Sequence, residues 1–102
     1  MDGLHELTLA AGLNPNNELL TCELAMLHLA AHQPREAVSL LEGKPLKNGW
    51  AYIVLAMAWE QENKPGRAML NLLKAKKMGY KGYWIKEMSR RISSKTGFKL
   101  FE

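Results

Sequence analysis

Apolar residues recur three to four positions apart along most of this chain, which is the spacing of amphipathic helices. Short polar, proline-containing or glycine-containing segments interrupt the pattern at Asn14-Pro15-Asn16-Asn17, His32-Gln33-Pro34, Glu42-Gly43-Lys44-Pro45, Asn63-Lys64-Pro65-Gly66 and Met78-Gly79-Tyr80-Lys81-Gly82. Asn and Pro favour helix starts, and Gly favours helix ends and turns. The sequence therefore predicts an all-α fold of short helices joined by tight turns.

The interruptions divide the chain into two helical hairpins with a helix on either side. The first hairpin covers about residues 15–43, with its first helix starting near Pro15, and the second covers about residues 47–78. Before them, Leu4, Leu7 and Ala11 keep the spacing of a leading helix. After them, residues 83–94 place one apolar stripe on a helix that would cap the end of the stack. We expect residues 1–102 to form a single domain.

The two hairpins resemble each other in sequence at a spacing of 31 residues. Leu24-Ala25-Met26, Pro34, Ala37 and Leu41 recur as Leu55-Ala56-Met57, Pro65, Ala68 and Leu72. A repeat of this length is typical of stacked helical hairpins, each of which buries its apolar face against the next. Such stacks present a concave surface that binds peptides or helices, so we expect a binding protein rather than an enzyme.

The frame of the repeat resembles the tetratricopeptide repeat. The second hairpin places Tyr52, Leu55, Ala56, Trp59, Ala68 and Leu72 at the family's positions, and the first follows with Thr21, Leu24, Ala25, His28, Ala37 and Leu41. The repeat is shorter than the family's length of about 34 residues, and the closing proline is replaced by Gly49 and Tyr80. The resemblance implies a short tetratricopeptide-like solenoid over about residues 18–80.

The resemblance also implies which side chains would line a partner-binding groove. These are Leu19, Cys22, Met26, Leu29, Trp50, Ile53 and Met57. They are mostly apolar, whereas tetratricopeptide domains that hold the carboxylate end of a peptide use Lys, Arg and Asn here. An apolar groove suits the hydrophobic face of a partner helix. The alternative is that some of these side chains pack against the first or last helix of the chain itself.

The order of a leading helix, two hairpins and a terminal helix resembles the small helical-repeat chaperones of bacterial type III secretion. The resemblance extends over His5 to Ile92, including Ala37-Val38-Ser39-Leu40-Leu41 and Trp50-Ala51-Tyr52. It implies a chaperone that sequesters an amphipathic helix of a secreted needle-type subunit, together with a small co-chaperone. Residues Met1 to Glu6 lack the features of a secretory signal, and no run of 18 apolar residues could span a membrane, so we expect a cytoplasmic protein.

The net charge of +4 is concentrated in the last third of the chain. Residues 74–102 hold nine Lys or Arg against two acidic residues, whereas residues 1–73 hold five against eight. A candidate basic patch comprises Lys74, Lys77, Lys81, Lys86, Arg90 and Arg91. Nucleic-acid binding or a generic scaffold role through this patch is the alternative function. The simpler interpretation is a solvated helix face that also attracts an acidic partner, so nucleic acid is the less favoured ligand.

Little in the sequence indicates catalysis or a cofactor. His28 and His32 are four residues apart, a spacing that can place two metal ligands on one helix face, but no third ligand accompanies them. Cys22 has apolar neighbours and no adjacent base, which is typical of a packed cysteine rather than a nucleophile. We therefore predict no enzyme activity, no metal site and no cofactor.

Overall fold

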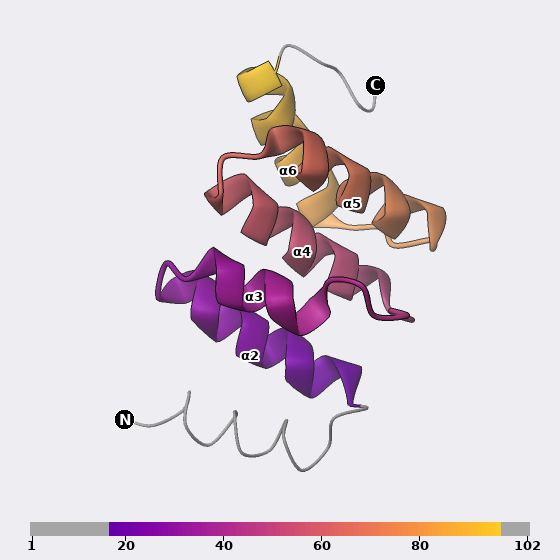
Figure 1. Ribbon diagram of the computed structural model, residues 1–102. Coiled ribbons are helices and arrows are strands. Elements are labelled where there is room, and N and C mark those ends of the chain that lie inside the picture. Colours follow the sequence, from indigo (N-terminus) through magenta and orange to yellow (C-terminus); the bar gives the residue numbers. More distant parts are fainter. Residues whose placement is uncertain (1–16, 97–102) are drawn as a thin grey trace.

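A computed structural model describes residues 17–96, which are helical almost throughout and contain no strand (Figure 1). Their five helices are α2 (Glu18–Ala30), α3 (Pro34–Leu41), α4 (Gly49–Gln61), α5 (Pro65–Lys77) and α6 (Tyr83–Thr96). The prediction of an all-α fold built from helical hairpins is confirmed. The predicted leading helix around Leu4, Leu7 and Ala11 lies outside the described residues.

α2 begins at Glu18, three residues after the predicted start near Pro15. The reason is a cap at Asn17, whose side-chain oxygen accepts a hydrogen bond from the Leu20 amide at 3.2 Å. Such a bond satisfies one of the amide donors that the first helical turn leaves without a partner. Of the several asparagines in this segment, the sequence pattern alone did not identify the one that caps the helix.

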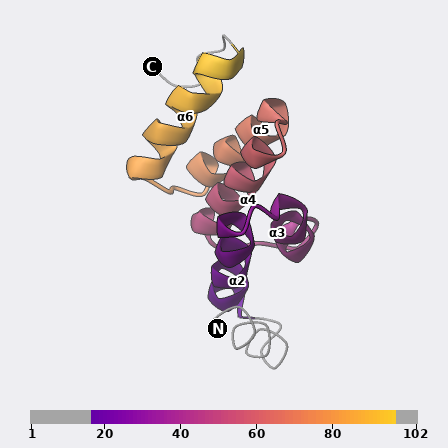
Figure 2. The same ribbon diagram turned by 90° about the vertical axis from the view of Figure 1, so that its left-hand side faces the viewer.

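α4 is the central element, in contact with α2, α3, α5 and α6 (Figure 2). Its sequence, GWAYIVLAMAWEQ, is apolar on every side rather than along one stripe. A helix of this kind is stable only when neighbours cover its whole circumference. Accordingly, Ala51, Leu55 and Ala58 on one side and Ile53 and Ala56 on the opposite side are all buried.

The residues that recur 31 positions apart form equivalent parts of the core. Ala25 and Ala56, on the first helix of each hairpin, and Ala37 and Ala68, on the second, have no exposed surface. Small side chains at these places allow two helices to approach closely, and larger residues such as Leu41 and Leu72 fill the adjacent space. The sequence repeat therefore reflects a repeated packing arrangement.

The two hairpin turns also repeat. His32 and Asn63 both have left-handed backbone conformations, with φ of 58° and 60°. In the first turn the Gln33 amide donates to the His28 carbonyl at 2.8 Å, and in the second the Lys64 amide donates to the Trp59 carbonyl at 2.9 Å. These bonds end the helix in a Schellman motif. The prolines at positions 34 and 65 then start the returning helices.

α6 packs against α4 and α5 at the end of the stack. Met88 and Ile92, on its apolar stripe, have no exposed surface. The Glu60 carboxylate of α4 forms ion pairs with Arg91 at 3.2 Å and with Lys95 at 3.6 Å. The combination of an apolar stripe and an ionic edge fixes which side of α4 the terminal helix covers.

Candidate protein-binding surface

The structure divides the seven predicted groove residues into two groups. Cys22, Leu29 and Ile53 are at most 5% exposed and belong to the core, and Met57 is only 9% exposed. By contrast, Leu19 is 58% exposed, and Met26 and Trp50 are half-buried at the edge of the core. The apolar side chains of this set that a partner can reach without a rearrangement are therefore Leu19, Met26 and Trp50.

The core group is inaccessible because the helices beside α4 approach it closely. On one side, the Gln61 side chain donates to the Leu29 carbonyl of α2 at 3.0 Å. On the adjacent side, Glu60 pairs with Arg91 of α6. Met57 lies one helical turn before these two anchor points, and Ile53 lies one turn further back on the same side of α4. Ile53 and Met57 are both buried, so this side of α4 does not present them to a partner.

α2 carries an apolar face that the rest of the described chain leaves accessible. Leu19 and Met26 are seven residues apart and lie on the same side of the helix as the exposed Ala30. Glu23 is the charged residue between them, and it is also exposed. We call Leu19, Met26 and Ala30 the α2 free face. It is a narrow apolar strip that extends over about three helical turns.

Leu27 extends this accessible surface, and the sequence analysis did not identify it. It is 37% exposed, whereas its equivalent 31 residues later, Ala58, is completely buried. α4 packs against both helices of the first hairpin, whereas the described part of the chain has no helix before α2 that could cover Leu27. The sequence signal that could have indicated Leu27 is a large residue at a position where the second hairpin has the small residue Ala58.

A hollow of about 890 Å³ lies beside Leu19, between the start of α2 and the α3–α4 connection. Leu41, Pro45 and Leu46 contribute apolar walls. At its rim the Glu18 carboxylate accepts hydrogen bonds from the backbone amides of Lys47 at 2.8 Å and Asn48 at 2.7 Å. The carboxylate thus holds the connection in place and shapes one end of the accessible surface.

The environment of Glu18 lowers its pKa from the ordinary value of 4.5. Burial by itself disfavours the charged form, but the hydrogen bonds from the Lys47 and Asn48 amides, together with the positive charge of Lys47, more than offset that effect. The carboxylate is therefore ionised at neutral pH and accepts these bonds in full.

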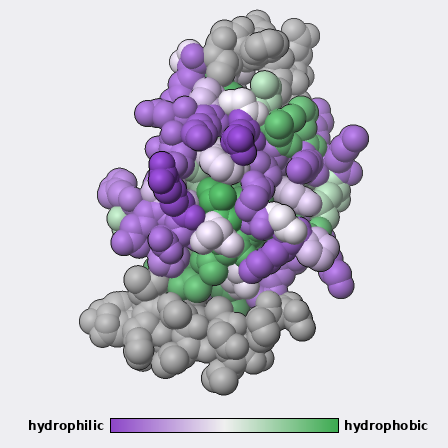
Figure 3. All heavy atoms as spheres, viewed as in Figure 1, coloured by the Kyte–Doolittle hydropathy of each residue, from purple (hydrophilic) through white to green (hydrophobic). Residues whose placement is uncertain are grey.

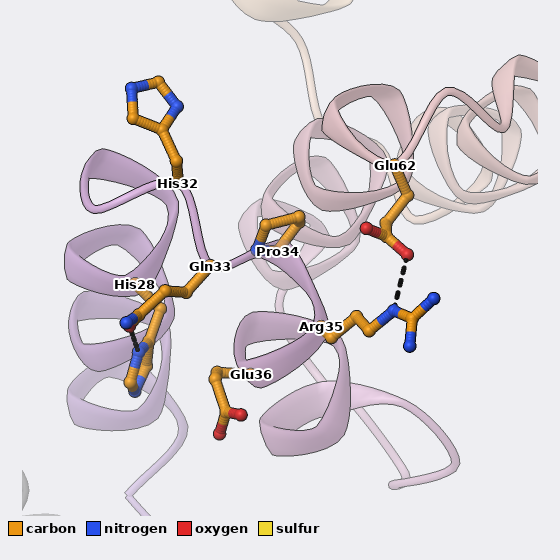
Figure 4. A pocket seen from close by; sticks show the side chains of 7 residues that line it. All are labelled: His28, His32, Gln33, Pro34, Arg35, Glu36 and Glu62. Atoms are coloured by element: carbon orange, nitrogen blue, oxygen red, sulfur yellow. Dashed lines mark hydrogen bonds and ion pairs between the residues drawn. The ribbon is translucent and has the colours of Figure 1, made fainter.

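A second hollow, of about 500 Å³, lies on the polar side of the hairpin turns (Figure 4). There the His28 ring nitrogen Nδ1 forms a hydrogen bond with Gln33 at 2.9 Å, and Arg35 forms an ion pair with Glu62 at 3.0 Å. His32, in the turn, points away from His28, so the helical spacing of the two histidines does not bring their rings together. Within residues 17–96 no group of three His, Cys, Asp or Glu is placed to hold a metal ion.

Cys22 is 1% exposed. Burial, followed by the negative charges of Glu18 and Glu23, raises the pKa of its thiol to about 11. The thiol is therefore protonated at neutral pH, and it packs as a small apolar side chain.

The six residues of the candidate basic patch differ in how they are paired. Lys74, Lys77, Lys81 and Lys86 are exposed. Arg90 forms an ion pair with Glu87 at 2.8 Å, and Arg91 pairs with Glu60. The two arginines therefore serve the packing of α6 at least in part, and the free positive charge comes mainly from the four lysines.

Comparison of the chain with protein-family models, with curated proteins and with solved structures found no match. Among the described residues, the helices are too short or too polar to cross a membrane.

Proposed function

We propose that this protein is a cytoplasmic, non-catalytic chaperone or adaptor that sequesters an amphipathic helix of a partner protein. The observation that carries the proposal is the α2 free face, where Leu19 is 58% exposed and Met26 is half-buried two turns further along. A helix places its own apolar side chains at intervals of three, four and seven residues. Leu19 and Met26 are seven residues apart on α2, so they can pack against apolar side chains at the same spacing on a partner helix.

The energetics favour a helix as the bound element. An exposed leucine that becomes fully buried contributes about 1.5 to 3 kcal/mol before entropy losses. Leu19 is an anchor of this kind, Met26 contributes less because it is already half-buried, and the adjacent hollow at Leu41 and Leu46 offers further apolar surface. The face carries one charged residue, Glu23, so it does not resemble a site for a phosphate or a peptide carboxylate.

The resemblance to small type III secretion chaperones makes the partner more specific. We propose a secreted needle-type subunit that polymerises after export, stored with the help of a small co-chaperone. A polymerising subunit must expose an apolar helix face that is prone to self-association, and covering that face in the cytoplasm prevents premature assembly. The fold fits this role, because a stack of hairpins provides a rigid surface against which a single helix can pack.

The proposal is tested by recovering the tagged protein from its own cells and measuring intact masses of what co-purifies. We expect one or two small helical proteins in fixed stoichiometry, and we expect Leu19→Asp with Met26→Asp to abolish their recovery. Ser39→Asp, at an exposed position of α3, is the matched control and should recover them unchanged. Equal recovery by the double variant, with helix content intact by circular dichroism, would contradict the proposal.

Nucleic-acid binding through the basic patch is the second candidate. The four exposed lysines favour it, but Arg90 and Arg91 are engaged by Glu87 and Glu60. Phosphate contacts supply most of the affinity of such complexes, so this pairing weakens the case. In the same recovery experiment, RNA that disappears after nuclease treatment would move the function to this patch.

A further inference from the structure

A second apolar face lies on the outer side of α5. Leu70 is 59% exposed and Leu73 is 38% exposed. Lys74 and Lys77 are exposed beside them. These four residues recur at spacings of three, four and seven, so they share one side of the helix. We call them the α5 outer face; Figure 3 shows hydrophobic side chains reaching the surface over this helix.

The packing of the fold does not account for these leucines. α5 is held to its neighbours by its other side, where Ala68, Leu72 and Ala75 are completely buried. The repeat provides an internal comparison, because the positions equivalent to Leu70 and Leu73 in the first hairpin are Ser39 and Glu42, both exposed. The same architecture is thus built with polar residues at these places in one hairpin and with leucines in the other.

The charges beside the leucines indicate the chemistry of a partner. In the described part of the chain, no carboxylate forms an ion pair with Lys74 or Lys77. Lys74 lies over the ring of Tyr52, 5.7 Å from its centroid, and keeps its charge exposed. A bound surface with carboxylates around an apolar strip would complement both features.

We propose that the α5 outer face binds an acidic amphipathic helix of a partner protein, with leucine-sized side chains against Leu70 and Leu73 and carboxylates toward Lys74 and Lys77. The proposal goes beyond the capture of a helix at the α2 free face and does not depend on it, since α5 contacts α4 and α6 rather than α2. Nucleic acid is the less suitable occupant, because the most exposed apolar side chains beside the lysines are aliphatic leucines, which cannot stack on bases, and the Tyr52 ring is partly buried under Lys74.

The test uses a synthetic peptide of about 18 residues, long enough to form a helix when bound. It carries leucines on one face flanked by glutamates, and a twin carries lysine in place of every glutamate. Binding is measured by fluorescence anisotropy, and the contact site by amide chemical shifts in the full chain. We expect the acidic peptide to bind at least tenfold more tightly than its twin and to shift the amide signals of residues 70–77. Its affinity should fall as salt is added.

Two double variants separate the apolar and the ionic contributions. Leu70→Ser with Leu73→Ser should weaken the affinity for the acidic peptide by about tenfold or more. Lys74→Gln with Lys77→Gln should remove the preference for the acidic peptide over its lysine-containing twin. Tyr83→Ser, which removes a large exposed side chain from α6 outside both apolar faces, is the control and should change neither. Circular dichroism checks that each variant is folded.

Four outcomes would overturn the proposal. They are equal affinity for the two peptides, no binding of the acidic peptide at millimolar concentration, shifts centred on α2, and displacement of the acidic peptide by a single-stranded oligonucleotide that binds more tightly. A fifth concerns self-association. If the unbound chain forms a dimer in sedimentation velocity and the two leucine substitutions dissociate it, the face is an interface between copies of this chain.

Discussion

His32 and Asn63 hold equivalent left-handed backbone positions in the two hairpin turns. Asparagine adopts this conformation at a lower energetic cost than histidine. A residue with a Cβ is strained there by roughly 1–2 kcal/mol, whereas asparagine is better tolerated and glycine is unstrained. Both side chains are exposed, so a substitution changes little besides the backbone.

We predict that His32→Gly raises the free energy of unfolding by roughly 0.5–1 kcal/mol, after allowance for the greater flexibility of glycine in the unfolded chain. Asn63→Gly should raise it by less. Urea denaturation of the two variants beside the wild type measures both effects. A larger gain at Asn63 than at His32 would show that the turns are not strained in the way described.

Glu18 gives the fold a specific dependence on pH. Because its pKa is lower in the folded chain than the ordinary 4.5, its hydrogen bonds to the Lys47 and Asn48 amides stabilise the fold fully above about pH 4.5. That contribution is lost as the pH falls through the lower, folded-state pKa. Since the carboxylate is near the surface, solvent screening limits it to about 1 kcal/mol.

We predict that Glu18→Gln lowers the free energy of unfolding by about 1 kcal/mol at pH 7. The difference from the wild type should shrink steadily as the pH falls below about 4.5, because protonation removes the same charge from the wild type. Chemical denaturation at a series of pH values measures the difference. A difference that stays constant as the pH falls would mean that the carboxylate charge contributes nothing.

The sequence predicted the core residues of the repeat better than the candidate binding residues. Ala25, Ala37, Ala56 and Ala68 are recognisable as packing positions because the 31-residue spacing repeats them. For Cys22, Leu29 and Ile53, helical spacing indicates a shared side of the helices but not how closely α2 and α6 approach α4. That closeness depends on contacts such as Gln61 to the Leu29 carbonyl, which link distant parts of the chain and leave no local pattern.

At the scale of the elements, the turn residues made the helix boundaries predictable. Pro34 starts α3 where the sequence indicated, whereas Pro65 starts α5 within the segment 63–66 that was predicted as a turn. Gly43 and Gly79 follow helix ends with positive φ values of 78° and 90°. These residues restrict the backbone locally, so their effect does not depend on the rest of the fold. The start of α2 was less predictable, because several asparagines compete as its cap.

Gly49 shows how a helix start can be limited by a neighbouring element. A Cβ added there would lie 2.7 Å from the Cβ of Tyr80, in the connection between α5 and α6. At Gly66, near the start of α5, an added Cβ would meet nothing within 4 Å. The two glycines are therefore a matched pair, one required by close packing and one not.

We predict that Gly49→Ala lowers the free energy of unfolding by about 1–3 kcal/mol, the usual cost of overpacking, even though alanine is the better helix former. Gly66→Ala should raise it by up to about 1 kcal/mol, since only helix propensity changes there. Thermal and urea unfolding of both variants provide the measurement. Stabilisation by both substitutions would show that α4 does not approach Tyr80 so closely.

At the scale of the whole molecule, polar contacts join the two hairpins at both ends of their interface. Glu18 accepts hydrogen bonds from the backbone just before α4, while Gln61 and Glu62, at the end of α4, bind Leu29 and Arg35 of the first hairpin. α4, apolar on all sides, cannot be stable without both α2 and α5 beside it. We therefore expect the described helices to unfold as one cooperative unit.

The two accessible apolar faces lie on different helices of that unit. The α2 free face has Glu23 among its apolar side chains, and the α5 outer face has Lys74 and Lys77. The uneven distribution of charge along the sequence thus makes the α2 free face locally acidic and the α5 outer face basic. This arrangement suits a protein that holds its main partner at one face and meets a second, acidic partner at the other.

The most direct test of the proposed function is photo-crosslinking in the source cells, with p-benzoylphenylalanine placed at position 26 or, as a control, at position 39. We predict that position 26, on the α2 free face, forms a covalent adduct whose added mass is that of one small helical protein. Position 39, on the exposed side of α3, should form none. Adducts from position 39 but not from position 26 would contradict the assignment of helix capture to α2.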